Sequence, residues 1–323
     1  MPASHRDPRD TAPRTAMPTV PEPMLATLTE DRFSDKNWIF EKKWDGVRCL
    51  AFRDAKGAVG LRSRNDLVLD DRYPEVVDAV RSQLETSAVL DGEVVAFRGT
   101  HSSFEELQQR RSGTRVFYYV FDVLYLDGRD VRELPLRQRK RLLRDHVQFA
   151  GPLRFTAHRN ETGEEEYRKA CARGDEGVIA KRADAPYRAG RSKDWLKFKC
   201  VRNQELVIGG FTDPKGSRAA FGALLVGYYD GDDFIYAGKV GTGFDDKVLR
   251  YLHERMTKLE RNTSPFTGGR LRVPRDGSMH FVDPQLVAQF GFTEWTRDGM
   301  LRHPRYEGLR DDKDAHEVVR ETR

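Results

Sequence analysis

The octapeptide Glu41-Lys42-Lys43-Trp44-Asp45-Gly46-Val47-Arg48 is the most informative stretch of the chain. It places a lysine, Lys43, close to an aspartate, a glycine and an arginine in a segment with the composition of a turn. A lysine attacks phosphorus or a carbonyl carbon only when its amine is neutral, and burial or nearby cations lower its pKa. Asp-Gly is also a common hairpin turn, so a charged β-turn without chemistry remains an alternative.

Two further segments each place a glutamate beside a glycine at the start of an apolar run. Glu93 ends the sequence LDGE at 90–93, and Glu176 begins the sequence EGVIAK at 176–181. A carboxylate that opens a strand can face a ribose hydroxyl or a hard metal ion. Each segment taken alone is more often an ordinary turn followed by a strand.

A pair of lysines alternates with apolar residues in the sequence DWLKFK at 194–199. Lys197 and Lys199 are two residues apart, so on a strand both ammonium groups lie on one face. Two like charges side by side repel each other, and an anionic ligand such as a triphosphate would relieve that repulsion. Two solvated lysines on an exposed strand are an equally good explanation.

The rest of the chain predicts an α+β fold in two parts. Strand-like runs at 49–54, 88–98, 116–126, 177–182 and 194–200 are interspersed with helix-like stretches at 73–84, 103–111, 136–147 and 165–174. They do not alternate strictly, which argues against a doubly wound sheet. From about residue 205 the texture changes to short strands between turn residues, with one helix at 246–260, which predicts a small β-barrel.

Composition limits the class of protein without identifying it. The 323 residues carry a net charge of +5, which permits a nucleic-acid partner but does not require one. No apolar stretch is long enough for a membrane span, and the first twenty residues lack the apolar region of a secretory signal. The three cysteines are an odd number without a CxxC pair, so we expect neither a disulfide nor a zinc site, and a reducing cytoplasm.

The motifs occur in the order KxDGxR, DGE, EGxxxK and WLKxK, and together they are far more specific than any one of them. In this order the chain resembles the covalent nucleotidyltransferases, which comprise ATP-dependent DNA ligases, RNA ligases and mRNA capping enzymes. Four further segments are similar to ligase motifs, namely PMLA at 23–26, SRN at 63–65, FD at 121–122 and RYEGLRDDK at 305–313. The resemblance is strongest to the ligase module of bacterial end-joining ligases and runs from about residue 21 to 316.

This resemblance implies a nucleotidyltransferase (adenylation) domain with antiparallel sheets, followed by a C-terminal OB-fold β-barrel. We expect a flexible tail at 1–18, the adenylation domain at 19–204, the OB-fold domain at 205–316 and a tail at 317–323. It also implies three steps: Lys43 takes AMP from ATP, AMP passes to a DNA 5′-phosphate, and a 3′-hydroxyl then displaces AMP. Lys197 and Lys199 would hold the α-phosphate of ATP and lower the pKa of Lys43.

The resemblance also assigns residues to the nucleoside and the metal ion. Phe121 would stack on the adenine, and Glu41 would accept a hydrogen bond from the adenine amino group. Glu93 would reach the ribose hydroxyls, and Glu176, together with Glu93, would hold Mg²⁺ or Mn²⁺.

Five cationic residues complete the expected site. Arg48 and Arg64 would bind the ribose and the 5′-phosphate of the nick, because a planar guanidinium fork suits a dianion. Arg305 and Lys313 would engage the leaving pyrophosphate. Arg191 is assigned to the nucleotide from its spacing before the WLKFK strand.

The resulting hypothesis is an ATP-dependent DNA ligase that acts on nicked or broken duplex DNA. We expect a monomeric, cytoplasmic and nucleoid-associated enzyme with no membrane contact, and the resemblance implies a Ku-type end-binding protein as partner. The alternatives are an RNA ligase or capping-type guanylyltransferase and, from another class, a non-catalytic nucleic-acid binding module. The motif at 305–313 argues against an RNA ligase, Glu41 argues against GTP, and an intact Lys43 argues against a pure binding module.

Overall fold

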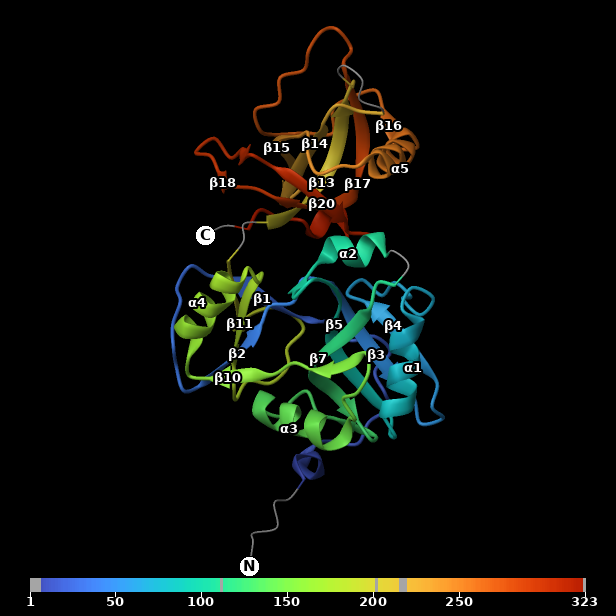
Figure 1. Cartoon of the computed structure of the whole chain (residues 1–323), viewed down its shortest axis with the longest axis vertical. Helices are drawn as coiled ribbons and strands as arrows, with labels where there is room; N and C mark the ends of the chain where they lie inside the picture. The colour runs from blue at the N-terminus through green and yellow to red at the C-terminus, as the bar shows by residue number, and fades with distance from the viewer. Residues whose placement is uncertain (1–6, 111–112, 201–202, 215–219, 322–323) are drawn as a thin grey trace, which may run out of the picture. The chain divides into compact units, whose positions relative to one another are not determined.

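The computed structural model describes residues 7–110, 113–200, 203–214 and 220–321 (Figure 1). The chain divides into two compact units, Met1–Val201 and Arg202–Thr322, each of which is described by itself. Within the described ranges, no helix has the length and apolar character needed to cross a membrane.

A seven-stranded sheet forms one half of the first unit. Its order is β4-β3-β5-β7-β8, with β6 paired to β5 and β9 paired to β7. The strands are β3 (Val47–Arg53), β4 (Val59–Ser63), β5 (Ala88–Arg98), β6 (His101–Ser102), β7 (Val116–Leu126), β8 (Arg129–Asp130) and β9 (Leu153–Phe155). All pairs except β7–β9 are antiparallel. The central strands β5 and β7 are apolar along most of their length because both of their faces are largely buried.

A five-stranded sheet forms the other half of the first unit, in the order β1-β12-β11-β2-β10. Its strands are β1 (Met24–Leu28), β2 (Trp38–Lys42), β10 (His158–Asn160), β11 (Gly177–Arg182) and β12 (Gly190–Lys199). Only the β1–β12 pair is parallel. Because β2 is the neighbour of β11 and β11 is the neighbour of β12, Lys43 directly after β2, Glu176 directly before β11 and the WLKxK motif on β12 belong to three adjacent strands or their ends.

Four α-helices accompany these sheets: α1 (Pro74–Gln83), α2 (Phe104–Gln109), α3 (Leu136–His146) and α4 (Gly163–Arg173). All four were expected from the sequence within a few residues, although residue 111 of the stretch expected at 103–111 lies outside the described part. Gly174 ends α4 in the left-handed conformation, at φ 74°. Helix α3 packs against β7 (Figure 1).

The second unit is built around an antiparallel sheet with its own core. The sheet has the order β15-β14-β13-β17-β16, and β20 also pairs with β17. Its strands are β13 (Asn203–Thr212), β14 (Leu224–Asp230), β15 (Asp233–Val240), β16 (Glu260–Arg261), β17 (Met279–Gly291) and β20 (Arg305–Leu309). A small hairpin of β18 (Glu294–Trp295) and β19 (Leu301–Arg302) and one helix, α5 (Asp246–Thr257), complete it. The expected α+β class, with a strand-rich second part and one inserted helix, is confirmed.

The segments expected to be tails are partly packed. Residues Pro8–Thr11 form a short 3₁₀ helix, Ala12 is buried, and the Thr15 amide donates to the Gly128 carbonyl at 3.0 Å. Near the other end Val318 is buried, and its carbonyl accepts from the Tyr229 amide at 2.7 Å. Small apolar residues and satisfied backbone groups explain this packing, which composition did not reveal. Residues 1–6 and 322–323 lie outside the described part.

Candidate active site

The side chain of Lys43 contacts a carboxylate from another strand of the same sheet. Lys43 follows directly after β2, and its Nζ forms an ion pair with Glu176 Oε1, just before β11. The Lys43 amide donates to the Gly177 carbonyl at 2.9 Å. Gly177 has φ 148°, and a Cβ there would lie 2.0 Å from the Phe198 carbonyl oxygen, so a glycine is required at this close approach.

The pKa of Lys43 is shifted in the direction opposite to the one expected. Burial lowers it, but the carboxylates of Glu176, Asp45 and Glu93 together raise the pKa of Lys43 above its usual value. The expected lowering by neighbouring lysines is therefore not found, because carboxylates dominate the surroundings of this amine. The resting enzyme holds Lys43 as an ammonium group.

Glu176 offers one oxygen that is not used within the protein. Its side chain is 7% exposed, and among the described residues its buried Oε2 has no hydrogen-bond partner. Such an atom fits a cation ligand or a bound water, because a buried carboxylate oxygen without a partner is costly. No group of three or more acidic, histidine or cysteine side chains within the described ranges is arranged to hold a metal ion by itself. Phosphate and water oxygens would have to supply the remaining ligands.

Glu93 lies on the neighbouring sheet and also acts on Lys43. It is partly buried on β5, opposite Arg48 of β3 and Tyr119 of β7. Its charge contributes to the raised pKa of Lys43. Lys43 and Glu176, from two of the motifs, are thus in direct contact, and Glu93, from a third, acts on Lys43 through its charge.

Glu41 is held between two lysines, Lys181 at the end of the EGxxxK motif and Lys140, which the sequence did not single out. It is 3% exposed on β2, its Oε1 pairs with Lys140 of α3, and its Oε2 lies 2.7 Å from Lys181 Nζ of β11. Burial opposes the charged form, but the two ammonium groups lower the pKa of Glu41 below its usual value. Burial lowers the pKa of Lys181 to about 8. Glu41 is therefore an ionised acceptor inside the protein.

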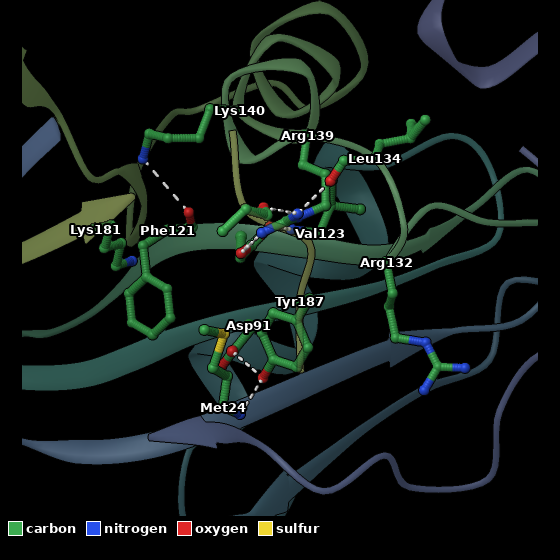
Figure 2. Close-up of polar contacts among 12 residues, drawn as sticks. Met24, Asp91, Phe121, Val123, Arg132, Leu134, Arg139, Lys140, Lys181 and Tyr187 are labelled. Atoms are coloured by element: carbon green, nitrogen blue, oxygen red, sulfur yellow. Dashed lines mark hydrogen bonds and ion pairs between the residues drawn. The ribbon is translucent and has the colours of Figure 1, made fainter. Parts of the chain in front are cut away.

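Phe121, the residue expected to stack on the base, lies beside these lysines (Figure 2). Its side chain is 7% exposed on β7, and the Lys181 ammonium lies 4.1 Å from its ring centroid. The ring of Trp195 on β12 packs edge-on to it at 5.9 Å between centroids. An adenine that stacks on Phe121 would therefore lie close to Lys181 and Trp195, neither of which was assigned a role from the sequence.

Arg48 is bound to a neighbour and does not point unpaired into a site. Its Nε and Nη2 donate to Asp91 Oδ1 and Oδ2 at 2.5 and 2.6 Å. Asp91 also accepts from the Tyr187 hydroxyl at 2.7 Å, and that hydroxyl accepts from the Met24 amide at 2.9 Å (Figure 2). Burial opposes the charge, but Asp91 raises the pKa of Arg48 above its usual value. Asp91 and Tyr187 thus fix Arg48, and neither could be recognised from spacing alone.

Lys197 and Lys199 lie on β12 as the alternation predicted. They are partly buried and stand opposite Ile179 and Gly177 of β11. The Gly177 carbonyl also accepts from the Lys43 amide, so the backbones of Lys199 and Lys43 are both neighbours of Gly177. Leu196 and Phe198, the apolar residues that alternate with these lysines, pack on the other face of the sheet with residues of β2 and α4.

Two of the expected arginines lie at the edges of this region. Arg64 is partly buried in the turn after β4, where the Ser63 hydroxyl accepts from the Asn65 amide at 3.2 Å. Arg191 is exposed on β12, and its Nη1 donates to the Ala26 carbonyl of β1 at 3.0 Å. That contact links the N-terminal strand to β12.

Arg305 and Lys313 belong to the second unit, and each lies near a glutamate of that unit. Arg305 is exposed on β20 and pairs with Glu307 at 3.0 Å. Lys313 Nζ lies 3.6 Å from Glu205 Oε1 at the start of β13. Both residues thus have acidic neighbours in their own unit.

A disulfide joins Cys171, in the last turn of α4, to Cys200, directly after β12. This corrects the expectation that no cysteines would pair. Their Cα atoms are 5.1 Å apart, although 29 positions separate them in sequence, and only the fold brings them together. The closed loop contains Glu176, Lys197 and Lys199, and the Cys200 amide donates to the Glu176 carbonyl at 2.9 Å.

Comparison with known proteins now identifies the class. The family model described as the ATP dependent DNA ligase domain matches residues 23–199, and the one described as the ATP dependent DNA ligase C terminal region matches residues 217–313. The chain belongs to the family of ATP-dependent DNA ligases. The two-part fold and the class of enzyme expected from the motifs are thereby confirmed.

Within this family the chain is similar to LigD proteins. It is 37% identical over 324 residues to the multifunctional non-homologous end joining protein LigD of Pseudomonas aeruginosa, covering 95% of this chain and 37% of that protein. It is 39% identical over 307 residues to the LigD of Mycobacterium tuberculosis, covering 93% of this chain and 40% of that protein. The chain thus spans about two fifths of the length of these relatives.

Two solved structures agree with this similarity. The mycobacterial DNA ligase D complexed with ATP and MES matches with a TM-score of 0.68 and 35% identity, over 93% of this chain and 98% of that one. The ligase domain of LigD from M. tuberculosis matches with a TM-score of 0.51 and 36% identity, over the same shares of the two chains.

Proposed function

We propose that this ligase seals breaks between a 3′-hydroxyl and a 5′-phosphate in duplex DNA through a covalent Lys43–AMP intermediate. The observation that supports this most directly is the contact between Lys43 and Glu176, with Glu93 close enough to shift the pKa of Lys43. A partly buried amine in contact with a carboxylate that can take up its proton, with two lysines on the same sheet, suits an attack on the α-phosphate of a nucleotide.

In the first step the Lys43 nitrogen forms a bond to the α-phosphorus, and the bond from that phosphorus to the bridging oxygen breaks. Pyrophosphate leaves, and Lys43 gives up two protons: the ammonium group loses one before its nitrogen can attack, and the nitrogen loses the second as the phosphoramidate forms. Glu176 Oε1 already contacts the ammonium group, so it is the nearest group to which the first proton can move, and the second passes to the leaving pyrophosphate or to water. Lys197 and Lys199 would then balance the charge of the α-phosphate from the same sheet.

A divalent cation is part of the proposal because Glu176 has a buried oxygen without a partner among the described residues. We assign Glu176 and Glu93 as its protein ligands, directly or through water. When bound, Mg²⁺ or Mn²⁺ neutralises charge on the phosphates. The nucleoside would be read by Glu41 and Phe121.

The assay for the covalent intermediate uses ATP labelled at the α-phosphate, Mg²⁺ and a denaturing gel. We expect an acid-labile AMP adduct in the native chain and none in Lys43→Ala. Lys42→Ala is the matched control, because Lys42 is the adjacent residue and pairs with the adjacent carboxylate, Asp175, at 2.6 Å. If Lys42→Ala lost the adduct and Lys43→Ala kept it, the assignment would be wrong by one residue.

The second unit, which we propose as the OB-fold domain at 205–316, would act in the same step. Arg305 and Lys313 would engage the leaving pyrophosphate, while Arg48, Arg64 and Arg191 would serve the ribose and the phosphates. Lys313→Ala should slow adduct formation and leave the sealing of pre-adenylylated DNA unchanged, and an equal loss in both assays would remove Lys313 from the pyrophosphate.

We also propose that the enzyme serves end joining with a Ku-type end-binding protein, since the relatives carry non-homologous end joining in their names. It would act as a monomer in the cytoplasm at the nucleoid, a location that follows from the substrate and not from the cysteines. The test compares the joining of linear duplexes with the sealing of nicks, each with and without a purified Ku-type protein. Stimulation confined to linear duplexes supports the partner, and no stimulation of either rules it out.

A further inference from the structure

Helix α3 buries a lysine on the face where an apolar residue would be expected. Its buried residues are Leu136, Arg139, Lys140, Leu142 and Leu143, which follow helical spacing. Lys140 is not exposed at all. An ammonium group costs several kcal/mol to bury unless it is fully paired, so its partners are the reason for its position.

Those partners occupy all three donors of the Lys140 ammonium group. Its Nζ pairs with Glu41 Oε1 and donates to the Thr156 carbonyl at 3.0 Å. It also donates to the Phe121 carbonyl at 3.4 Å, the contact drawn in Figure 2. Glu41 is on β2 of the five-stranded sheet, whereas Phe121 is on β7 of the seven-stranded sheet. One ammonium group therefore connects the two sheets at the two residues assigned to the base.

We propose that Lys140 is a positioning residue for nucleobase recognition: it fixes the Glu41 carboxylate relative to the Phe121 backbone, so that Glu41 selects adenine over guanine. The inference rests on the proposed lysyl-nucleotide function. An ionised carboxylate only accepts hydrogen bonds. Adenine presents an amino donor at its sixth position, where guanine presents a carbonyl acceptor, so a fixed carboxylate favours the first and repels the second.

Lys140 has this role because, within the described part of the chain, no other ion pair of Glu41 leads to the seven-stranded sheet. Its second partner, Lys181, lies on β11 of the same sheet as Glu41 itself. Without Lys140, Glu41 would remain paired on one side but could shift relative to Phe121. The base would then stack on Phe121 of β7, while the distance from Phe121 to the Glu41 carboxylate on β2 would vary.

The experiment measures lysyl-nucleotide formation with labelled ATP and labelled GTP in the native chain and in Lys140→Gln. We expect the KM for ATP to rise about tenfold with kcat within about threefold, and the preference for ATP over GTP to fall about tenfold. Arg139→Gln is the matched control, because Arg139 is the adjacent residue, is equally buried and contacts Asp122 instead of Glu41. It should lower the thermal midpoint and leave the nucleotide preference unchanged.

Glu41→Gln keeps the test decisive where Lys140→Gln is too unstable to assay. Glu41→Gln should reduce the preference for ATP over GTP about as much as Lys140→Gln does. The double variant should differ from Glu41→Gln in that preference by less than about twofold. An unchanged preference in Glu41→Gln, or in folded Lys140→Gln, would overturn the inference. No lysyl adduct in the native chain would instead overturn the proposed function, so the two failures are distinguishable.

Discussion

Arg139 and Asp122 form a two-pronged ion pair from which solvent is fully excluded. The Arg139 Nε and Nη2 donate to the two carboxylate oxygens of Asp122 at 2.7 and 2.8 Å, and neither side chain has any exposed surface. The pair joins α3 to β7 directly beside Phe121. A buried pair of this kind is sensitive to the loss of one partner, because the remaining charge is then uncompensated.

Arg139→Met should therefore destabilise the chain by about 3–5 kcal/mol, measured as the free energy of unfolding in urea. Changing both residues, Arg139→Met with Asp122→Leu, should recover part of that loss, since no charge is then left buried alone. Equal destabilisation by the single and the double variant would show that packing, and not the unpaired charge, causes the effect.

The Cys171–Cys200 disulfide should add measurable stability. A loop of this size, with 29 positions between the cysteines, corresponds to about 3–4 kcal/mol in the chain-entropy account. Dithiothreitol should lower the free energy of unfolding of the native chain and leave a Cys171→Ser, Cys200→Ser variant unaffected. Three titratable thiols in the denatured, unreduced protein would contradict the pairing.

His158 should make the fold less stable in mild acid. It stands opposite Glu41 on β10, and burial and the charge of Lys140 lower its pKa to about 4. Above about pH 6.5 the ring is neutral in both states and has no effect. As the pH falls toward 4, the unfolded chain takes up a proton that the folded chain does not, so stability is lost.

The loss assigned to His158 should be about 1–2 kcal/mol, because the ring is partly exposed and solvent screens part of the shift. Unfolding free energies at pH 7 and pH 4.5 should therefore differ less in His158→Gln than in the native chain. The same pH dependence in both proteins would show that another group is responsible.

Arg64 should matter more for sealing than for forming the lysine adduct. It lies in the turn after β4, and it is assigned to the 5′-phosphate of the nick, where a guanidinium fork makes two charge-assisted hydrogen bonds. Arg64→Ala should slow the sealing of pre-adenylylated nicked DNA on the order of a hundredfold and leave adduct formation nearly unchanged.

Arg62→Ala is the matched control for Arg64, because Arg62 lies two residues earlier and pairs with Asp66 at 3.3 Å. Equal losses in both assays for Arg64→Ala would place that residue in the nucleotide pocket. Unchanged sealing would remove it from the site.

The strands of the candidate site could be predicted because each motif can be recognised from a short, continuous stretch of sequence. Alternation places Lys197 and Lys199 on one face of a strand, and the segment EGVIAK predicts a strand that follows directly after Glu176. These features depend on neighbours in sequence, and the structure brings them together. The roles assigned to these side chains stay predictions.

What could not be predicted depends on contacts between distant segments. In the sequence LRQRKRLLRDH of α3, Arg139 and Lys140 look like solvated charges, and their acidic partners lie 17 and 99 positions away. The spacing of Cys171 and Cys200 is equally uninformative. The contact between Arg48 and Asp91, a member of the LDGE motif, also could not be recognised from spacing, and the role assigned to Arg48 stays a prediction.

The three contacts of the Lys140 ammonium group constrain the amino-acid sequence to different degrees. Two of its three acceptors are main-chain carbonyls, those of Phe121 and Thr156, which any residue supplies. Side-chain substitutions at those two positions therefore leave these two hydrogen bonds of Lys140 intact. The third acceptor is the Glu41 side chain, so a substitution at position 41 or 140 alone would break the ion pair. We therefore expect residues 41 and 140 to covary in an alignment of related sequences.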